Sequence, residues 1–219
     1  MMKWIIKLKK EKIIQMETEN RTCNGLCAEC DDASKCILAD PHLKEQKISS
    51  ELIYEGRILR VTRDIVKLEN GAETVREVVH HNGGACVVPL TDECEVMLVR
   101  QFRYPHSCET LEVPAGKLEL GEDPMECAKR ELEEEVGAKS EQLYSLGNFL
   151  PTPAYDKEIT YMYLAQGLQF GAQHLDEGEF LDVVKMPLQK AVQMVMENKI
   201  PDGKTQIALL KTWMMITQG

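Results

Sequence analysis

Residues 116–138 read GKLELGEDPMECAKRELEEEVGA, a glycine-bearing stretch followed by an acidic segment with helical spacing. Asp123 and Pro124 predict the start of a helix, because Asp caps the first free amides and Pro suits the first helical position. Glu126 completes a capping-box pattern. Gly137 predicts the end of the helix, because glycine readily adopts the left-handed conformation found there.

One side of this helix carries three carboxylates. At about 100° per residue, Glu131, Glu134 and Glu135 fall within an arc of roughly 100°. The neighbouring apolar face consists of Met125, Ala128, Leu132 and Val136. Because like charges at this spacing repel one another, a cation is expected among them, and Mg²⁺ suits oxygen ligands and substrate phosphates. The alternative is a solvated acidic face balanced by Lys129 and Arg130.

The spacing of this stretch, G-x5-E-x7-R-E-L-x-E-E-x-G-A from Gly116 to Ala138, resembles the Nudix box at every defining position. The flanking segments LVRQFRYP, LEVPAGKLE and PTPAYDKE are similar to the ADP-ribose pyrophosphatase branch of the Nudix hydrolases. Pro153 follows Gly137 at the distance typical of that branch. The resemblance covers about residues 47–215 and implies Mg²⁺-dependent hydrolysis of ADP-ribose to AMP and ribose 5-phosphate.

The resemblance assigns roles to the matching residues. Glu131, Glu134 and Glu135 would hold Mg²⁺, with Mn²⁺ as the alternative metal, and the carbonyl of Ala115 would add a ligand. Glu134 would also take part in catalysis. Arg130 would contribute to catalysis by orienting the glutamates.

Two glycines and an acidic loop complete this expectation. Gly116 and Gly121 would let the chain before the helix bend tightly. The segment LDEGEF resembles a loop that supplies a glutamate in related pyrophosphatases. Glu177 is therefore the predicted general base and Glu179 an additional metal ligand. The alternative is a solvated acidic loop.

Substrate contacts are also expected from the resemblance. Arg76 in REVV and Arg103 in QFRYP are similar to arginines that hold the substrate phosphates, and a guanidinium can bind phosphate oxygens in a bidentate way. Glu112 and Glu158 are further substrate-side candidates. GDP-mannose or another nucleoside diphosphate sugar is the alternative substrate, and a ligand sensor without catalysis is the alternative function.

Four cysteines near the N-terminus form a second pattern: Cys23, Cys27, Cys30 and Cys36. Four thiolates within a short segment are enough for a Zn²⁺ site or an iron–sulfur cluster. The spacing is less regular than paired C-x2-C knuckles. The alternative is a cysteine-bearing tail in a reducing cytosol.

Charge and hydropathy exclude several classes of function. The net charge of −10 argues against general nucleic-acid binding, which needs a basic face. No run approaches the roughly 20 apolar residues that cross a bilayer, so a cytoplasmic location without membrane binding is expected. Met1 and Met16 remain alternative starts of the chain.

The expected fold class is α+β. Alternating segments predict strands within residues 51–81, 84–90 and 95–102, with an Asn-Gly turn at 70–71, and later strands at 159–168 and 180–186. Helical spacing recurs in two segments near the C-terminus.

The resemblance implies a Nudix α/β/α sandwich of mixed sheets with an N-terminal antiparallel β-sheet subdomain, and a homodimer. The expected domains are a cysteine-bearing leader (1–45), an N-terminal β subdomain for dimerisation (46–82) and a Nudix hydrolase domain (83–219).

Overall fold

The computed structural model describes residues 43–218. The four-cysteine cluster with its predicted Zn²⁺, and the two alternative start sites, lie outside the described residues. The strands are β1 (Gln46–Glu55), β2 (Arg60–Lys67), β3 (Glu73–His80), β4 (Gly84–Pro89), β5 (Glu95–Arg103), β6 (Cys108–Glu112), β7 (Ala115–Lys117), β8 (Ala138–Lys139), β9 (Gln142–Phe149), β10 (Thr160–Gln166), β11 (Gln169–Phe170) and β12 (Leu181–Pro187). The helices are α2 (Pro124–Val136), α3 (Leu188–Met196), α4 (Gly203–Gln218) and a short 3₁₀ turn, Tyr104–His106.

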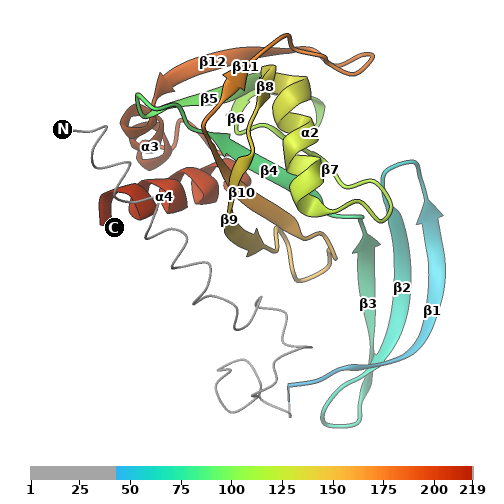
Figure 1. The fold of residues 1–219 in the computed structure, drawn as a ribbon. Helices are drawn as coiled ribbons and strands as arrows, with labels where there is room; N and C mark the ends of the chain where they lie inside the picture. Colours follow the sequence, from blue (N-terminus) through green and yellow to red (C-terminus); the bar gives the residue numbers. More distant parts are fainter. Residues whose placement is uncertain (1–42, 219) are drawn as a thin grey trace.

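The N-terminal strands form a sheet of their own. β1, β2 and β3 pair antiparallel in that order and stand to one side of the other elements (Figure 1). The predicted Asn-Gly turn joins β2 to β3, where Gly71 adopts a φ of 84° and the side chain of Asn70 accepts from the amide of Ala72 at 3.0 Å. The predicted antiparallel N-terminal sheet is confirmed.

Two further sheets make up the centre of the molecule. One has the order β7-β4-β10-β9, with β4 and β10 parallel, and the other is the antiparallel sheet β12-β5-β6. Helix α2 covers one face of the first sheet and α4 the other (Figure 1). The expected sandwich of mixed sheets and helices is therefore confirmed.

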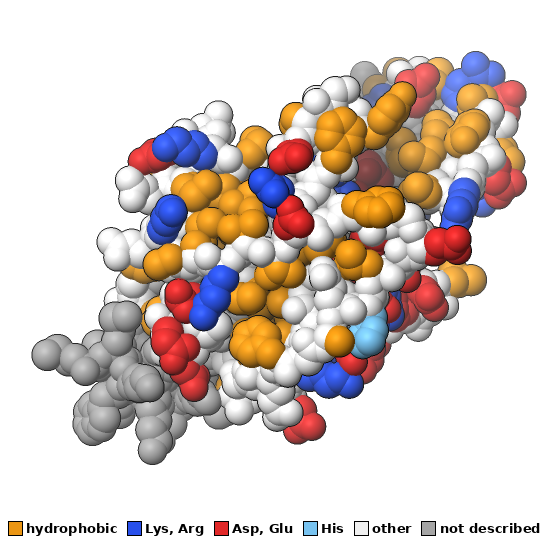
Figure 2. Space-filling model, turned by 90° about the horizontal axis from the view of Figure 1, so that it is seen from above, with side chains coloured by type: hydrophobic (Ala, Val, Ile, Leu, Met, Phe, Trp, Pro, Cys, Tyr) orange, Lys and Arg blue, Asp and Glu red, His pale blue; other side chains and the backbone are white. Residues whose placement is uncertain are grey.

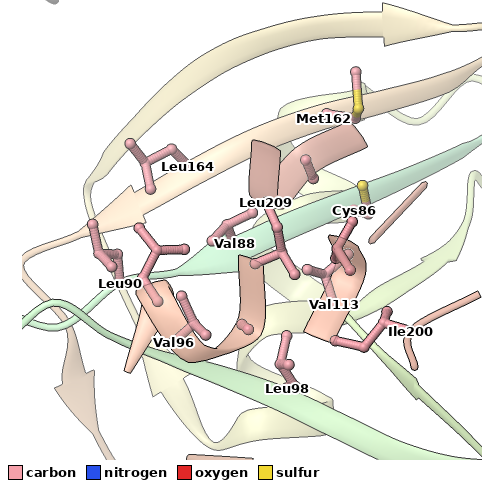
Figure 3. Close-up of a cluster of buried hydrophobic side chains, with 14 of the residues drawn as sticks. Cys86, Val88, Leu90, Val96, Leu98, Val113, Met162, Leu164, Ile200 and Leu209 are labelled. Atoms are coloured by element: carbon pink, nitrogen blue, oxygen red, sulfur yellow. The ribbon is translucent and has the colours of Figure 1, made fainter. Parts of the chain in front are cut away.

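Every residue of β4 is buried, because helices cover both faces of the strand. Cys86 and Val88 point into the larger hydrophobic cluster, where they meet Leu209 of α4 (Figure 3). Ala85 and Val87 point into the second cluster, beneath α2. The site-bearing helix thus rests on a strand that packs on both sides.

Helix α2 begins and ends where the sequence predicted. The carboxylate of Asp123 accepts from the amide of Met125 at 2.8 Å, and Gly137 ends the helix with a φ of 68°. The reciprocal half of the capping box is absent from the described contacts, because Glu126 pairs with Lys129 instead, at 2.6 Å.

No helix within residues 43–218 is long and apolar enough to cross a membrane.

Candidate active site

The apolar face of α2 determines which of its glutamates are buried. Ala128 and Leu132 of this face are fully buried. Glu131 and Glu135 lie at the edge of this apolar face, so they are drawn inside and are 8% and 1% exposed. Glu134 points further outward and keeps partial exposure.

Arg130 lies among the glutamates of the helix and the preceding loop. Its guanidinium contacts Glu122 at 3.0 Å, Glu131 at 2.7 Å and Glu134 at 2.9 Å. The hydrogen bond that Arg130 donates to Glu122 is the main reason that the pKa of Arg130 is raised, so the arginine stays charged. This position is suited to holding the carboxylates in place, and the predicted orienting role of Arg130 stays a prediction.

Gly116 is a glycine for a steric reason. It lies in strand β7, and a Cβ on it would stand 1.6 Å from Oε1 of Glu131. The expectation that Gly116 provides a tight bend is therefore wrong. Gly121 does provide one, with a φ of 81°.

Glu135 is bound by the backbone of β7. The amide of Ala115 donates to Oε2 of Glu135 at 2.9 Å. The residue predicted to offer its carbonyl to a metal is thus adjacent to a carboxylate predicted to bind the same ion.

The two buried glutamates are difficult to ionise. Burial raises the pKa of Glu131 to about 7, against the opposing effect of Arg130. Burial raises the pKa of Glu135 to about 8, and the nearby charges of Glu131 and Glu179 add to the shift. A cation between these carboxylates would relieve the repulsion.

The donor set fits Mg²⁺ in chemistry, since buried carboxylate oxygens are the ligands that this ion prefers. Within residues 43–218, however, no group of three or more His, Cys, Asp or Glu side chains is already arranged around one point as metal ligands. Glu131 and Glu134 instead turn to Arg130, which is the nearby positive charge. Metal binding would therefore require these side chains to exchange Arg130 for the ion.

The acidic loop after β11 is tied to the C-terminal end of α2. The amide of His174 donates to the carbonyl of Glu134 at 3.0 Å, and the side chain of Gln173 donates to the carbonyl of Glu135 at 2.7 Å. These bonds satisfy carbonyls that the helix leaves free at its end. The two predicted acidic residues follow a few positions later.

Glu177 and Glu179 occupy different positions in that loop. Glu179 is partly buried, and its charge contributes to the raised pKa of both Glu131 and Glu135. Glu177 is exposed on a turn in which the amide of Glu179 donates to the carbonyl of Asp176 at 3.0 Å. The structure thus brings Glu179 near the buried pair and leaves Glu177 in solvent.

Arg103 and Glu112, both predicted on the substrate side, form an ion pair with each other. Nε and Nη2 of Arg103 donate to the two carboxylate oxygens of Glu112 at 2.7 and 2.6 Å, and the hydroxyl of Thr110 donates to Oε1 at 2.5 Å. Burial acts to raise the pKa of Glu112, but Arg103, Lys204 and Thr110 outweigh it and lower the pKa to about 2.

The beginning of α4 is the part of this region that the sequence did not reveal. Lys204 donates to Oε2 of Glu112, and it also contacts Asp202 at 3.0 Å. An aspartate before a helix is a capping signal, and Asp202 does accept from the amide of Thr205 at 2.9 Å. Nothing in the sequence links Lys204 to Glu112, which lies 92 residues earlier.

The remaining substrate candidates lie apart from these contacts. Arg76 stands on β3 and pairs with Glu45 at 2.5 Å. Glu158 accepts from the hydroxyl of Thr160 at 3.2 Å, next to the start of β4. Their predicted contacts with substrate stay predictions.

A groove of about 660 Å³ runs along the outer side of α2. Arg130, Glu134 and His174 are among the residues that line it. Neither Glu131 nor Glu135 is among its lining residues, so the groove reaches only the outward-facing side of the glutamate cluster.

Two family models match the chain in succession. The model of the nucleoside diphosphate sugar hydrolase N-terminal domain matches residues 45–79, and the NUDIX domain model matches residues 80–208. The first model corresponds to the sheet of β1 to β3, which carries Arg76. The second contains all the other predicted active-site residues within residues 43–218.

Two relatives are similar over most of their length. The methanol dehydrogenase activator of Bacillus methanolicus is 42% identical over 168 residues, which cover 76% of this chain and 91% of the relative. The ADP-ribose pyrophosphatase of Bacillus subtilis (strain 168) is 37% identical over 169 residues, which also cover 76% and 91%.

A solved structure supports the fold. The crystal structure of an ADP compounds hydrolase superposes with a TM-score of 0.69 and 24% sequence identity, covering 78% of this chain and 94% of that one.

Proposed function

The chain belongs to the Nudix family, and from this premise we propose that it hydrolyses the pyrophosphate bond of ADP-ribose, releasing AMP and ribose 5-phosphate. One observation carries the proposal. Glu131 and Glu135 are buried side by side with pKa values raised to about 7 and 8, and no Lys or Arg of residues 43–218 pairs with Glu135. A site of this kind is prepared for an external cation and the phosphates that accompany it.

We propose Mg²⁺ as that cation. Glu131, Glu134, Glu135, Glu179 and the carbonyl of Ala115 would hold it. When bound, it would offset the charge of the diphosphate and make water a better nucleophile. Mn²⁺ shares the preference for oxygen ligands and is the alternative.

The residues of the chain would divide the remaining work. Arg130 would release Glu131 and Glu134 to the metal and would stay beside them through its ion pair with Glu122. Arg103 would bind a phosphate oxygen, which lowers the negative charge that an attacking water meets. Glu177 would accept the proton of that water as the bond between phosphorus and the bridging oxygen breaks. Its exposure on the loop gives it access to solvent before substrate binds.

Product analysis tests this proposal directly. After incubation with ADP-ribose and Mg²⁺, mass spectrometry should detect AMP and ribose 5-phosphate in equal amounts. Glu134→Gln should lose most of the turnover while the protein stays folded, because it removes charge from the site without changing the packing. Absence of both products with the wild-type chain, or near-native turnover in that variant, would contradict the proposed reaction.

The terminal sugar has a second candidate. The N-terminal family model is named for nucleoside diphosphate sugar hydrolases, a name that does not specify the sugar. GDP-mannose, assayed in parallel for release of GMP, separates the two substrates by their relative kcat/KM. Tight ADP-ribose binding without cleavage in Mg²⁺ would instead favour a sensor.

A second candidate function comes from the relative named as an activator of methanol dehydrogenase, which is 42% identical to this chain. In that case the chain would raise the activity of a partner dehydrogenase. The test is methanol oxidation by a methanol dehydrogenase with and without the chain. The Glu134→Gln variant in the same assay shows whether activation needs the hydrolytic site.

We also propose that two copies pair through the N-terminal β subdomain, residues 46–82. Strand β1 is exposed along its whole length, and Ile48, Leu52 and Ile53 are each about half exposed. Figure 2 shows apolar side chains at the surface of this end of the molecule. Apolar side chains gathered at a sheet surface are typical of an interface. Analytical ultracentrifugation of the whole chain should therefore give the mass of a dimer.

A further inference from the structure

The first turn of α4 contacts the substrate side of the proposed site. Lys204 is largely buried and donates to Glu112, a carboxylate that is only 1% exposed. Burial acts to lower the pKa of Lys204, but Asp202 and Glu112 outweigh it and raise the pKa, so the ammonium stays charged. Glu112 is therefore shared between two cations, Lys204 and Arg103.

This sharing constrains the orientation of Arg103. The guanidinium uses Nε and Nη2 on Glu112, and Nη1 has no acceptor among residues 43–218. Because a guanidinium is planar, fixing one edge also fixes the direction of the remaining donors. The side chain is 40% exposed, so a ligand can reach it.

Glu112 can hold Arg103 in one direction only if Glu112 is itself fixed. Thr110 binds one of its oxygens at 2.5 Å and Lys204 binds the other. Lys204 comes from a different element, α4, so it ties the orientation of Arg103 to the position of that helix.

The same turn of α4 is anchored to the strand end that follows Glu112. The amide of Val113 donates to the hydroxyl of Thr205 at 2.9 Å, and Thr205 donates to Asp202 at 2.6 Å. Two residues further on, the amide of Ala115 donates to Glu135. The helix turn that carries Lys204 is therefore fixed by hydrogen bonds to the strand end and is not a free helix end.

We propose that Lys204 is a positioning residue for substrate binding, which holds Glu112 so that Glu112 directs the free edge of Arg103 toward a phosphate of the substrate. The inference rests on the proposed function, because it assumes that Arg103 binds the diphosphate. A residue that acts through another should lose its effect when the other is removed.

A double-mutant cycle tests this dependence. Lys204→Met, Arg103→Met and the double variant are compared by kcat and KM for ADP-ribose in Mg²⁺. Lys204→Met should raise KM about tenfold and change kcat less than about twofold, because the contact orients a binding group and not the reacting atoms. In the Arg103→Met background, the same change should alter KM by less than about twofold.

Further variants separate positioning from a purely structural role. Lys204→Arg should recover most of the affinity, because it restores a cation at Glu112. Lys199→Met is the matched control, since Lys199 pairs with Glu197 in the same region at 2.7 Å without touching Glu112. Should Lys204→Met fail to fold, Lys204→Gln takes its place in the cycle.

The outcomes are distinct. An equal increase of KM in both backgrounds, or no increase in either, would overturn the role of Lys204 while the wild-type hydrolysis still supports the proposed function. A wild-type chain that neither cleaves nor binds ADP-ribose, as judged by titration calorimetry, would overturn both.

Discussion

Two buried glutamates, Glu112 and Glu135, have opposite ionisation behaviour. Each is 1% exposed. The pKa of Glu112 is lowered to about 2, whereas that of Glu135 is raised to about 8. Equal burial therefore leads to opposite results.

The difference lies in the partners that the fold provides. Burial acts to raise the pKa of both carboxylates. Glu112 meets Arg103, Lys204 and a hydroxyl, and these reverse the effect. Glu135 accepts one backbone N–H, from Ala115, and the charge of Lys204 affects its pKa less than the opposing charges of Glu131 and Glu179.

The two carboxylates differ in whether the protein itself supplies a cation for them. A buried charge needs a counterion, and Glu112 finds two within the chain. Glu135 forms no ion pair with a Lys or Arg of residues 43–218, so its ionised form would be stabilised by a cation from outside. This difference supports the proposed roles of Glu135 in metal binding and of Glu112 in positioning Arg103.

The largest effect is expected from Glu135→Gln. The substitution keeps the shape and removes the charge, so turnover of ADP-ribose in Mg²⁺ should fall by on the order of 100-fold or more, given the several kcal/mol that a catalytic metal contributes. The melting temperature without metal at neutral pH should change little, because a carboxyl with a pKa of about 8 is then largely protonated and glutamine has nearly the same shape.

Glu133→Gln is the matched control for this prediction. Glu133 lies on the same helix, but it is partly exposed and pairs with Lys139 at 2.7 Å. Its loss should leave kcat within about twofold. Equal losses of turnover in the two variants would remove the distinction between the buried and the outer carboxylates.

Glu112→Gln should have the opposite signature, with a clear loss of stability. It leaves the buried Lys204 without one of its two carboxylates and Arg103 without its bidentate partner. The free energy of unfolding at pH 7, measured with urea, should fall by about 2–3 kcal/mol, at or just below the lower end of the range for a broken buried pair, because Arg103 is partly exposed. Glu109→Gln, on the exposed side of the same strand, should change it by less than about 0.5 kcal/mol.

Glu112→Gln should also change how the stability of the protein depends on pH in acid. Because the folded pKa of Glu112 is about 2 and its ordinary value is 4.5, its stabilisation is complete above pH 4.5 and is lost as the pH falls toward 2. The stability of the wild-type chain should therefore decline more steeply across this range than that of Glu112→Gln. Parallel profiles would show that Glu112 is not the compensated carboxylate described above.

The smallest effect is expected from Gln173→Ala. The side-chain amide of Gln173 donates to the backbone carbonyl of Glu135 at 2.7 Å. The substitution removes this bond, which ties the acidic loop to α2, without altering the charge of the site. We expect kcat to fall by about 3- to 10-fold, because a displaced loop misplaces Glu177 and Glu179. Gln193→Ala, which removes a side chain bonded to Glu197 on α3, should have no effect on kcat.

Much of the fold was predictable because its signals are local. The Asn-Gly turn, the cap at Asp123 and the stop at Gly137 act over a few residues, and each appears in the structure. The short strands β6 and β7 were not predicted, since their pairing with β5 and β4 depends on distant partners. The carboxylate of Glu131 lies where a side chain at position 116 would begin, and no local pattern contains this contact.

The candidate site divides in the same way. The register of Glu131, Glu134 and Glu135 follows from the period of one helix, so the sequence predicted that they share a side. Which of them is buried depends on the strand beneath the helix. Lys204 was missed because it comes 92 residues after Glu112 and carries no motif.

The sequence by itself determined the family and the residues predicted to bind a metal, because both depend on residue types at fixed spacing along one helix and its preceding loop. Only the tertiary structure decided which carboxylate is compensated and which is not. Ionisation in the interior depends on the charges that packing brings together, and those came from α4, β5 and the loop after β11. The opposite pKa shifts of Glu112 and Glu135 are therefore a property of the fold.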